Sequence, residues 1–535
     1  MSQHHAVPRR RAFPWRVLPL VALAAAAALP ARAQGKPRSA PPASAARPDS
    51  GRPPRDSAHA GDSLRIAAIG NRPPVVTHHE MRLGGTVLRY TATTGMLPIR
   101  NDSTGGTEGY IFYVAYTKDG VADPARRPIT FAFNGGPGSS TVWLHLGAFG
   151  PKRVKLLSDG TAPPPPYALE DNPNTLLDQT DIVFLDPVGT GYSRAANPKL
   201  GPKFWGLDQD IASVGEFIRL YLTRYERWGS PKFLAGESYG TTRAAGLSGY
   251  LADRGIALNG IILISTILDF GNSSQAPGND IGFVNFLPSY TAIAWYHKKL
   301  APDLEGESLA QVTRRSERWA RAGYATALMA GSALSAPERA AAVDTLARLT
   351  GLPRSFVDEN DLRVPLGRFD TELLRDQRLV VGRLDGRFTA FAIDGGAERG
   401  AFDPSEANIR NAFTPVLNDY VRRDLHYDDD AVYYILGGGV ARWQFPQGRY
   451  ASVTPSLQRA FAKNPHMKLY VAMGYYDTAT PYFAVEYMLD HLALSPAARA
   501  NITTGHFAAG HMVYIDGPSM VAFRAALRSF IAGAE

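Results

Sequence analysis

A five-residue stretch, "GESYG" at 236–240, has the spacing G-x-S-x-G. In this pattern the glycines let a strand turn sharply into a helix, which holds the central serine in strained geometry with its hydroxyl exposed. The strand-like residues 232–235 before it and the helical pattern of 241–253 after it fit that arrangement. In a chain with 51 glycines the alternative is an ordinary Gly-Ser turn after a buried strand. The stretch predicts Ser238 as a nucleophile if suitable partners exist elsewhere.

A serine hydroxyl at neutral pH needs a general base, and the base needs an acid that orients it. Asp477 and His511 each follow a strand-like run, and they come after Ser238 in the order serine, acid, histidine. Each alone is open to a structural interpretation, as a turn aspartate before a proline and as a histidine at a helix start. Three other histidines compete for the role of base: His466, His491 and His506. None lies in so glycine-flanked a turn, so Asp477 and His511 are the predicted acid and base.

The tetrahedral intermediate of such a reaction needs backbone N–H donors aimed at its oxyanion. The segment "FAFNGGPGSS" at 131–140 follows a strand, and its glycines let the backbone approach a ligand closely. A glycine-rich turn or a phosphate loop is the alternative, but no Gly-Lys-Ser/Thr follows. We expect one donor from Gly136 and the other from Tyr239, the residue after the nucleophile.

These residues need a sheet that brings their loops to one edge. Strand-like runs at 85–95, 109–120 and 127–138 come first, and continuous apolar runs at 181–189, 232–236 and 259–270 follow. An amphipathic helix is predicted at 208–229. Apolar strands separated by such helices indicate an α/β fold with a mostly parallel central sheet flanked by helices. We expect the opening strands to be antiparallel and to extend one edge.

Two further core-like strands, 467–473 and 501–507, come only after a long interval. Residues 271–455 are too many for a loop and contain helical patterns, so they are interpreted as an inserted, largely helical cap. A hairpin is predicted at 378–391 with Asp385-Gly386 at its turn. The predicted organisation is given by residue range: signal peptide 1–33, disordered linker 34–62, first core segment 63–270, cap 271–455 and second core segment 456–535.

The N-terminus has a basic start, an apolar run at 17–29 and small residues around Ala33, which is typical of a signal peptide cleaved there. Residues 34–62 are rich in Pro, Ala, Ser and Arg and predict a flexible linker. We expect a periplasmic or extracellular protein without a membrane span, exported by the Sec or the twin-arginine route.

Charge and cysteine content exclude several classes of function. The formal net charge is +8, and the first 62 residues carry ten basic and three acidic side chains, so the folded body is nearly neutral. Nucleic-acid binding is therefore not expected. The chain has no cysteine, which excludes disulfides, thiol nucleophiles and thiolate metal sites.

Five segments together resemble the serine carboxypeptidases of the α/β-hydrolase fold, as a bacterial secreted member would. They are "NGGPGSS" at 134–140, "DPVGTGYS" at 186–193, "GESYG" at 236–240, "GYYDTATP" at 474–481 and "GHMVY" at 510–514. The resemblance runs from about residue 80 onward and is weakest in the cap. It implies the same roles for Ser238, Asp477, His511, Gly136 and Tyr239 as the residues themselves do.

The resemblance also implies that Asn134, Gly135 and Glu237 hold the terminal carboxylate of a peptide substrate. A carboxylic acid in that role must be protonated to donate a hydrogen bond, which favours exopeptidase action in acid. The implied reaction is removal of C-terminal amino acids through an acyl-enzyme, with no metal or organic cofactor.

The sequence departs from the family in two places. The usual cysteine of the glycine loop is Ser139, and a second glutamate that often precedes Leu-Gly-Pro is replaced by Ala148. One hypothesis is that His145 or Arg243 supplies a positive charge instead; the alternative is that both are packing or surface residues.

Two other functions remain open at this point. The same triad would serve an esterase or an acyltransferase, and a binding protein on a hydrolase scaffold is the alternative without catalysis. The oligomeric state and the preferred C-terminal residue do not follow from the sequence.

Overall fold

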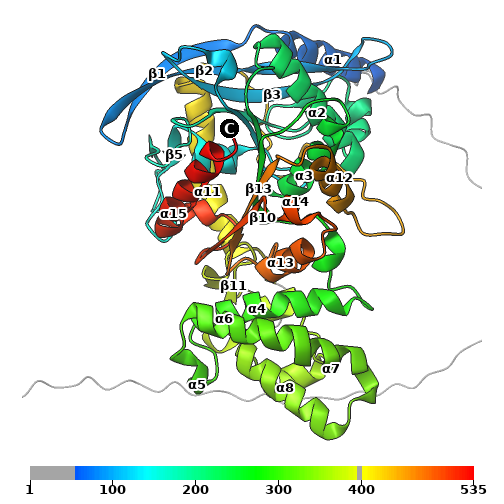
Figure 1. Ribbon diagram of the computed structural model, residues 1–535. Helices are drawn as coiled ribbons and strands as arrows, with labels where there is room; N and C mark the ends of the chain where they lie inside the picture. Colours follow the sequence, from blue (N-terminus) through cyan, green and yellow to red (C-terminus); the bar gives the residue numbers. More distant parts are fainter. Residues whose placement is uncertain (1–54, 394–399) are drawn as a thin grey trace, which may run out of the picture. The chain divides into compact units, whose positions relative to one another are not determined.

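The computed structural model describes residues 55–393 and 400–535 (Figure 1). The predicted signal peptide and most of the predicted linker lie outside the described residues. The linker prediction is wrong for residues 55–62, because helix α1 spans Arg55–Gly70. Its second half carries Ile66 and Ile69, which pack against the core and stabilise a helix that composition alone did not predict.

A ten-stranded mixed sheet forms the centre of the fold. The strands are β1 (Val75–Leu83), β2 (Thr86–Arg100), β3 (Thr107–Lys118), β4 (Ile129–Phe133), β7 (Asp181–Leu185), β8 (Arg194–Ala195), β9 (Lys232–Ser238), β10 (Gly260–Thr266), β13 (Lys468–Gly474) and β14 (Ile502–Phe507). Their order is β1-β2-β3-β7-β4-β9-β10-β13-β14, and β8 pairs with β3. From β7 to β14 all neighbours are parallel, whereas β1, β2 and β3 are antiparallel and extend one edge, as predicted.

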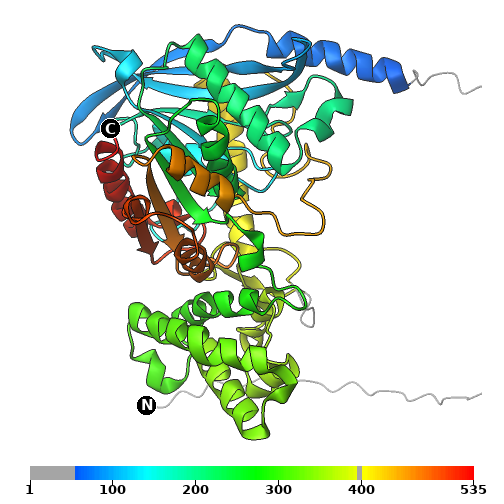
Figure 2. The ribbon, with the colours of Figure 1, turned by 45° about the vertical axis from the view of Figure 1, so that its right-hand side comes forward.

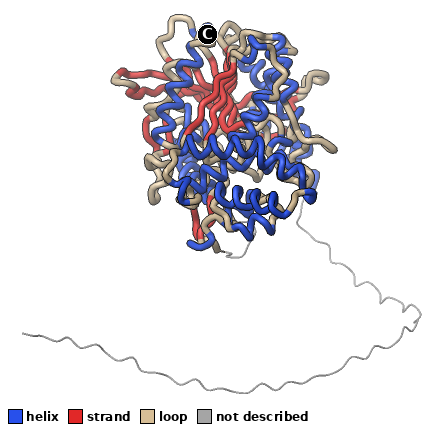
Figure 3. Tube along the Cα trace, turned by 60° about the horizontal axis from the view of Figure 1, so that its bottom comes forward, coloured by secondary structure: helices blue, strands red, loops and turns tan. Residues whose placement is uncertain are grey.

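The parallel strands are buried on both faces, which explains why they are apolar without alternation. In β9, Leu234 faces one hydrophobic cluster while Phe233 and Ala235 face the other. In β10 the alternation is the same, with Ile261 on the first face and Ile262 on the second. Figure 3 shows the strands enclosed by helices.

Helices of the core cover the two faces of the sheet. The helices on the first face are α2 (Leu207–Arg224), α3 (Tyr239–Ala252) and α12 (Thr454–Lys463). The helices on the second face are α11 (Pro404–Arg423) and α15 (Gly517–Ala532), together with the π-helix Leu144–Phe149. Two shorter helices, α13 (Tyr482–Asp490) and α14 (Pro496–Arg499), lie between the last two strands in sequence. A small antiparallel pair is formed by β5 (Lys152–Val154) and β6 (Leu169–Asp171).

A long, largely helical segment separates β10 from its parallel partner β13. Its helices are α4 (Asp280–Tyr296), α5 (Pro302–Glu305), α6 (Leu309–Trp319), α7 (Ala325–Ala330), α8 (Ala336–Thr350), α9 (Arg354–Glu359) and α10 (Leu366–Glu372), followed by α11. Figures 1 and 2 show α4, α6, α7 and α8 in green as a group of their own, and α4 packs against α13.

The predicted hairpin is confirmed as strands β11 (Leu379–Val381) and β12 (Thr389–Phe391), paired antiparallel. Residues 382–388, here called the hairpin loop, connect them and include Asp385 and Gly386. None of the helices in the described ranges is long and apolar enough to cross a membrane.

Candidate active site

Ser238 lies at the turn from β9 into α3, with φ of 59° and ψ of −131°. Such a conformation is strained for a residue with a side chain and is held by its surroundings. A Cβ on Gly236 would lie 2.2 Å from the Gly240 carbonyl oxygen, and one on Gly240 would lie 2.7 Å from the Phe133 carbonyl oxygen. The two glycines are therefore required by backbone contact, and the turn has the geometry of a nucleophile elbow.

The glycine loop lies directly against this elbow. A Cβ on Gly135 would lie 2.4 Å from the backbone nitrogen of Tyr239, so only glycine allows this approach. Gly136 follows with φ of 100°, a conformation that also favours glycine. The Tyr239 N–H is at the first position of α3, where a helix provides no acceptor for it. Gly136 and Tyr239 are thus brought together beside Ser238, as an oxyanion hole requires.

Asp477 and His511 form a buried pair at the carboxyl edge of the sheet. His511 Nδ1 lies 2.8 Å from Asp477 Oδ2, and the two residues are 4% and 0% exposed. Asp477 Oδ1 accepts the N–H groups of Ala479 and Thr480 at 2.8 and 3.0 Å, which fixes the carboxylate. Burial lowers the pKa of His511, but the neighbouring carboxylates of Asp477 and Glu237 outweigh it and raise the pKa overall. The pair is arranged as a base and its orienting acid.

Ser238 and His511 line one pocket of about 150 Å³. Ser238 Oγ and His511 Nε2 form no hydrogen bond in the structure, although both residues line the same pocket. Such contacts often tighten only when a substrate is bound. The remaining walls come from three sources: the glycine loop and the helix after it, the inserted segment, and the loops that carry Ser238, Asp477 and His511. In that order they are Asn134, Gly135, Gly136, Ser139 and Trp143; Arg383, Leu384, Glu406, Ile409 and Leu436; and Glu237, Ala479 and Met512.

Asn134 and Glu237 form an amide–acid pair in this pocket. Asn134 Nδ2 donates to Glu237 Oε1 at 2.9 Å, and Asn134 Oδ1 accepts the Leu144 N–H at 3.0 Å, which fixes the orientation of the amide. Glu237 is 3% exposed, and burial raises its pKa to about 7. The Tyr514 hydroxyl also acts on this carboxyl, but neither it nor Glu237 Oε2 has a hydrogen-bond partner of ordinary geometry among the described residues. A protonated Glu237 can therefore donate a hydrogen bond to a ligand in the pocket.

The hypothesis that His145 or Arg243 supplies a positive charge to the site is wrong. His145 lies in the π-helix with Nε2 2.7 Å from the Tyr116 hydroxyl, and burial lowers its pKa to about 3, so the ring is neutral. Arg243 is buried behind the pocket, where it pairs with Asp210 at 2.8 Å and donates to the Asn134 carbonyl at 2.7 Å. Neither residue lines the pocket.

Ala148 is fully buried in the π-helix and does not line the pocket either. At the position where the resemblance implied a second glutamate, Ala148 thus packs in the core.

The contacts of the hairpin loop with the loops that carry Asp477 and His511 were not predicted from the sequence. The Leu384 carbonyl accepts the His511 N–H at 2.6 Å, and Asp385 Oδ2 accepts the Gly510 N–H at 3.1 Å. Arg387 joins Asp385 at 2.7 Å to Asp516 at 2.9 Å. The signal in the sequence was Asp385-Gly386, interpreted only as a turn. The inserted segment therefore holds the loop that carries the base.

Thr480 was missed as well. Its hydroxyl donates to Asp477 Oδ2 at 2.6 Å and lies 3.2 Å from His511 Nδ1. The residue stands within the quoted segment 474–481, but nothing in its type distinguishes it from its neighbours.

The segment 186–193 supports the end of the glycine loop through a buried hydrogen bond. Asp186 Oδ1 accepts the Thr141 N–H at 2.8 Å, and burial raises the pKa of Asp186 to about 6. A Cβ on Gly191 would overlap the Asp186 carboxylate, which explains the glycine there. The segment is a brace for the site and does not reach the pocket.

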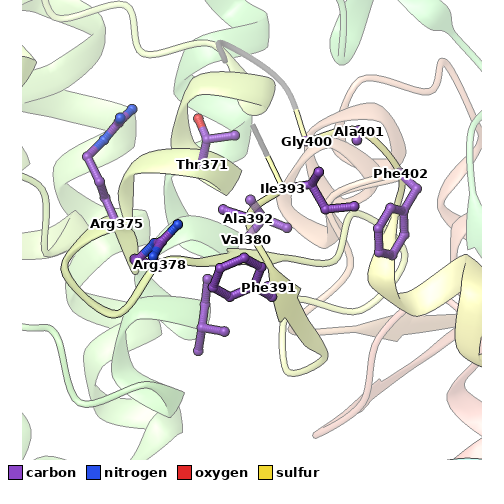
Figure 4. Close-up of a pocket in the computed structure, with 11 residues that line it drawn as sticks. Thr371, Arg375, Arg378, Val380, Phe391, Ala392, Ile393, Gly400, Ala401 and Phe402 are labelled. Carbon is purple, nitrogen blue, oxygen red and sulfur yellow. The ribbon is translucent and has the colours of Figure 1, made fainter. Parts of the chain in front are cut away.

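A second pocket lies on the hairpin of the inserted segment (Figure 4). Its walls include Arg378, Val380 and Phe391, and it contains none of the predicted site residues. The pocket at Ser238 is therefore the candidate catalytic pocket. Among the described residues, no group of three or more His, Asp or Glu side chains is placed to hold a metal ion.

The sheet order, the sharp turn after β9, and the positions of Asp477 after β13 and His511 after β14 are those of the α/β-hydrolase fold. Residues 88–311 match the model of the family described as serine carboxypeptidase. Over this segment the chain is similar to the serine carboxypeptidases.

Individual relatives agree with this relationship. The chain is 32% identical over 156 residues to Pheromone-processing carboxypeptidase KEX1 of Lachancea thermotolerans, which covers 28% of this chain and 19% of the relative. It is 32% identical over 135 residues to Serine carboxypeptidase-like 36 of Arabidopsis thaliana, covering 24% of each. The chain therefore spans about a fifth to a quarter of the length of these curated relatives.

Among solved structures, KEX1(delta)p, a prohormone-processing carboxypeptidase from Saccharomyces cerevisiae, superposes with a TM-score of 0.52. The alignment covers 82% of this chain and 91% of that chain at 16% identity, a likeness that shows the fold.

Proposed function

We propose that this protein is an exported serine carboxypeptidase that removes C-terminal amino acids from peptides. The observation that carries the proposal is one pocket that holds Ser238, His511 and the buried Asn134–Glu237 pair. The triad alone would suit any acyl transfer, but a buried acid with a pKa of about 7 and a free oxygen suits a ligand with a carboxylate.

In the proposed reaction, Ser238 Oγ attacks the last peptide carbonyl while His511 Nε2 takes its proton. The oxyanion receives hydrogen bonds from the N–H groups of Gly136 and Tyr239. Collapse of the intermediate breaks the C–N bond, and His511 gives the proton to the leaving amine. Water then attacks the acyl-enzyme with the same assistance and releases the shortened peptide.

The test is release of free amino acid from N-blocked dipeptides by the protein from residue 34 onward, with Ser238→Ala as control. In assays that span about pH 4 to about pH 8, we expect release by the wild type and none above background by the variant. Equal release by both proteins would contradict the proposal.

Two alternatives make different predictions in the same assay. An esterase or acyltransferase would be labelled at Ser238 by a fluorophosphonate and would cleave esters but no dipeptide. A binding protein without catalysis would not be labelled.

Export is also a proposal. It rests on the basic, apolar and small-residue regions of 1–33, and it predicts that the mature protein begins near Gln34. N-terminal sequencing of the protein from its native host tests this, and a start at Met1 would contradict it.

A further inference from the structure

The hairpin loop brings a cationic side chain into the catalytic pocket. Arg383 lines the same pocket as Ser238 and His511. Its backbone is fixed from two sides, because its N–H donates to Asp403 Oδ1 at 3.1 Å and its carbonyl accepts the Thr478 hydroxyl at 2.9 Å. The Arg383 side chain therefore extends from a fixed backbone position beside the loop that carries Asp477.

The guanidinium of Arg383 is exposed and forms no hydrogen bond or ion pair with the described residues. The other titratable side chains of the pocket each have a partner in the protein: Glu406 pairs with Arg410 at 3.0 Å, His511 pairs with Asp477 at 2.8 Å, and one oxygen of Glu237 accepts from Asn134. Among the described residues that line the pocket, Arg383 is the only arginine or lysine. The pocket thus holds one permanent positive charge that the protein does not neutralise.

Arg383 also lies on a particular side of the site. The next residue, Leu384, accepts the His511 N–H at 2.6 Å, which places Arg383 on the His511 side of the pocket, and the Arg383 charge opposes protonation of the imidazole. His511 must face the leaving nitrogen to give it a proton, so the side of the pocket beside His511 is the side of the leaving group. A positive charge in this place is closer to the leaving amino acid than to the acyl group of the substrate.

We propose that Arg383 determines specificity by binding a carboxylate of the leaving amino acid. An arginine is suited to this because its planar fork can form two charge-assisted hydrogen bonds with one carboxylate. The inference rests on the proposed function and adds to it a residue outside the segments that resemble the family. The carboxylate is either the C-terminal one or that of an acidic side chain.

Three N-blocked dipeptides that share the acyl residue distinguish the two sources. The first has a neutral leaving residue with a free carboxylate, the second has the same residue as its amide, and the third is the amide of a glutamate. Arg383→Met is compared with wild type on each by KM and kcat. Arg378→Met is the matched control, since Arg378 is exposed in the same hairpin but lies over Phe391 outside the catalytic pocket.

If Arg383 binds the terminal carboxylate, Arg383→Met raises KM about tenfold for the first peptide only, with kcat nearly unchanged. If it binds an acidic side chain, KM rises for the third peptide only. Arg383→Lys retains the charge without the fork and is expected to lie between wild type and the methionine variant. Arg378→Met should match wild type on all three.

Unchanged KM values for every peptide in Arg383→Met, with release by the wild type intact, would overturn this inference and leave the proposed function standing. An equal rise in KM for all three peptides would also overturn it, because it would indicate a general structural effect. No release of amino acid by the wild type would overturn both.

Discussion

The two halves of the proposed active site are built in different ways. The nucleophile half consists of Ser238, Gly136 and Tyr239, and it is held by backbone contacts within the central sheet, closer than a Cβ would allow. The base half consists of Asp477 and His511, and much of its support comes from the hairpin loop of the inserted segment.

Because of this difference, the two halves should tolerate substitutions to different degrees. A half made from tight backbone contacts is specified by glycines close in sequence and tolerates almost no change. A half made from hydrogen bonds to an inserted segment can be adjusted by residues distant in sequence, as the bond of Thr478 to Arg383 illustrates. The following variants probe this contrast.

Gly135→Ala should have the largest effect and tests the nucleophile half. The added Cβ would lie 2.4 Å from the Tyr239 nitrogen, so the glycine loop must move away and the oxyanion donors separate. We expect kcat to fall about 10²- to 10³-fold, the loss seen when one such donor is removed. Steady-state kinetics on a dipeptide measures it, and Gly306→Ala, whose added Cβ meets nothing, is the control. Activity near wild type would contradict the role of this contact.

Asp385→Ala should have the next largest effect and tests the base half. It removes the acceptor of the Gly510 N–H and the ion pair with the half-buried Arg387. We expect kcat to fall about tenfold and the free energy of unfolding to fall by about 3 kcal/mol. Kinetics and denaturant unfolding measure the two effects.

The matched control is Asp376→Ala, which breaks an exposed ion pair with Lys299 in the same segment. Little change is expected there, since exposed pairs contribute about 1 kcal/mol or less. Lower stability of Asp385→Ala with unchanged kcat would show that the inserted segment does not position the base.

Glu237→Gln tests whether Glu237, which lies between the two halves, binds the substrate carboxylate. The measurement is the pH dependence of KM. Glu237, with a pKa of about 7, is protonated below that pH and can donate to a substrate carboxylate; above it the donor is lost. For wild type we expect KM for a free-acid dipeptide to rise as pH increases through about 7. Glutamine donates at every pH, so the variant should lack this rise.

The acid limb should be present in both proteins. His511 must be neutral to act as a base, so kcat falls as pH drops through its raised pKa. The same alkaline rise of KM in Glu237→Gln would exclude Glu237 as the titrating group.

Thr480→Val should have the smallest effect. The hydroxyl donates one of four hydrogen bonds to the Asp477 carboxylate, two of which come from backbone N–H groups and remain. A loss of about threefold in kcat/KM is expected. The exposed Thr503 of β14 provides the control substitution to valine, and a loss of a hundredfold or more would mean that Thr480 has a direct catalytic role.

The same contrast explains what could be predicted from the sequence. The elbow and glycine loop follow from local residues, because Gly236, Gly240 and Gly135 are demanded by steric contact and stand within a few positions of the groups they serve. The parallel strands were recognisable since burial on both faces makes them continuously apolar. Asp477 and His511 were placed by chain order and by the strands before them.

The contacts that cross from the inserted segment could not be predicted in this way. Arg383 and Asp385 look like ordinary residues of a surface hairpin, and only the fold brings them to the catalytic loops. Arg243, near the elbow in sequence, lies behind the pocket because it pairs with Asp210 of α2. Nearness in sequence thus indicated the wrong arginine.

The shared hydrophobic cluster has a consequence for how this protein unfolds and how it can be engineered. Ile293 of α4 and Val312 of α6 belong to the same cluster as Ile261 and Leu263 of the sheet. The inserted segment and the sheet pack against each other without a break, so we expect them to melt together. Heating should then produce one cooperative transition. For the same reason the segment cannot be exchanged for that of a relative as a ready-made module, because the graft would leave cavities and clashes along the whole seam.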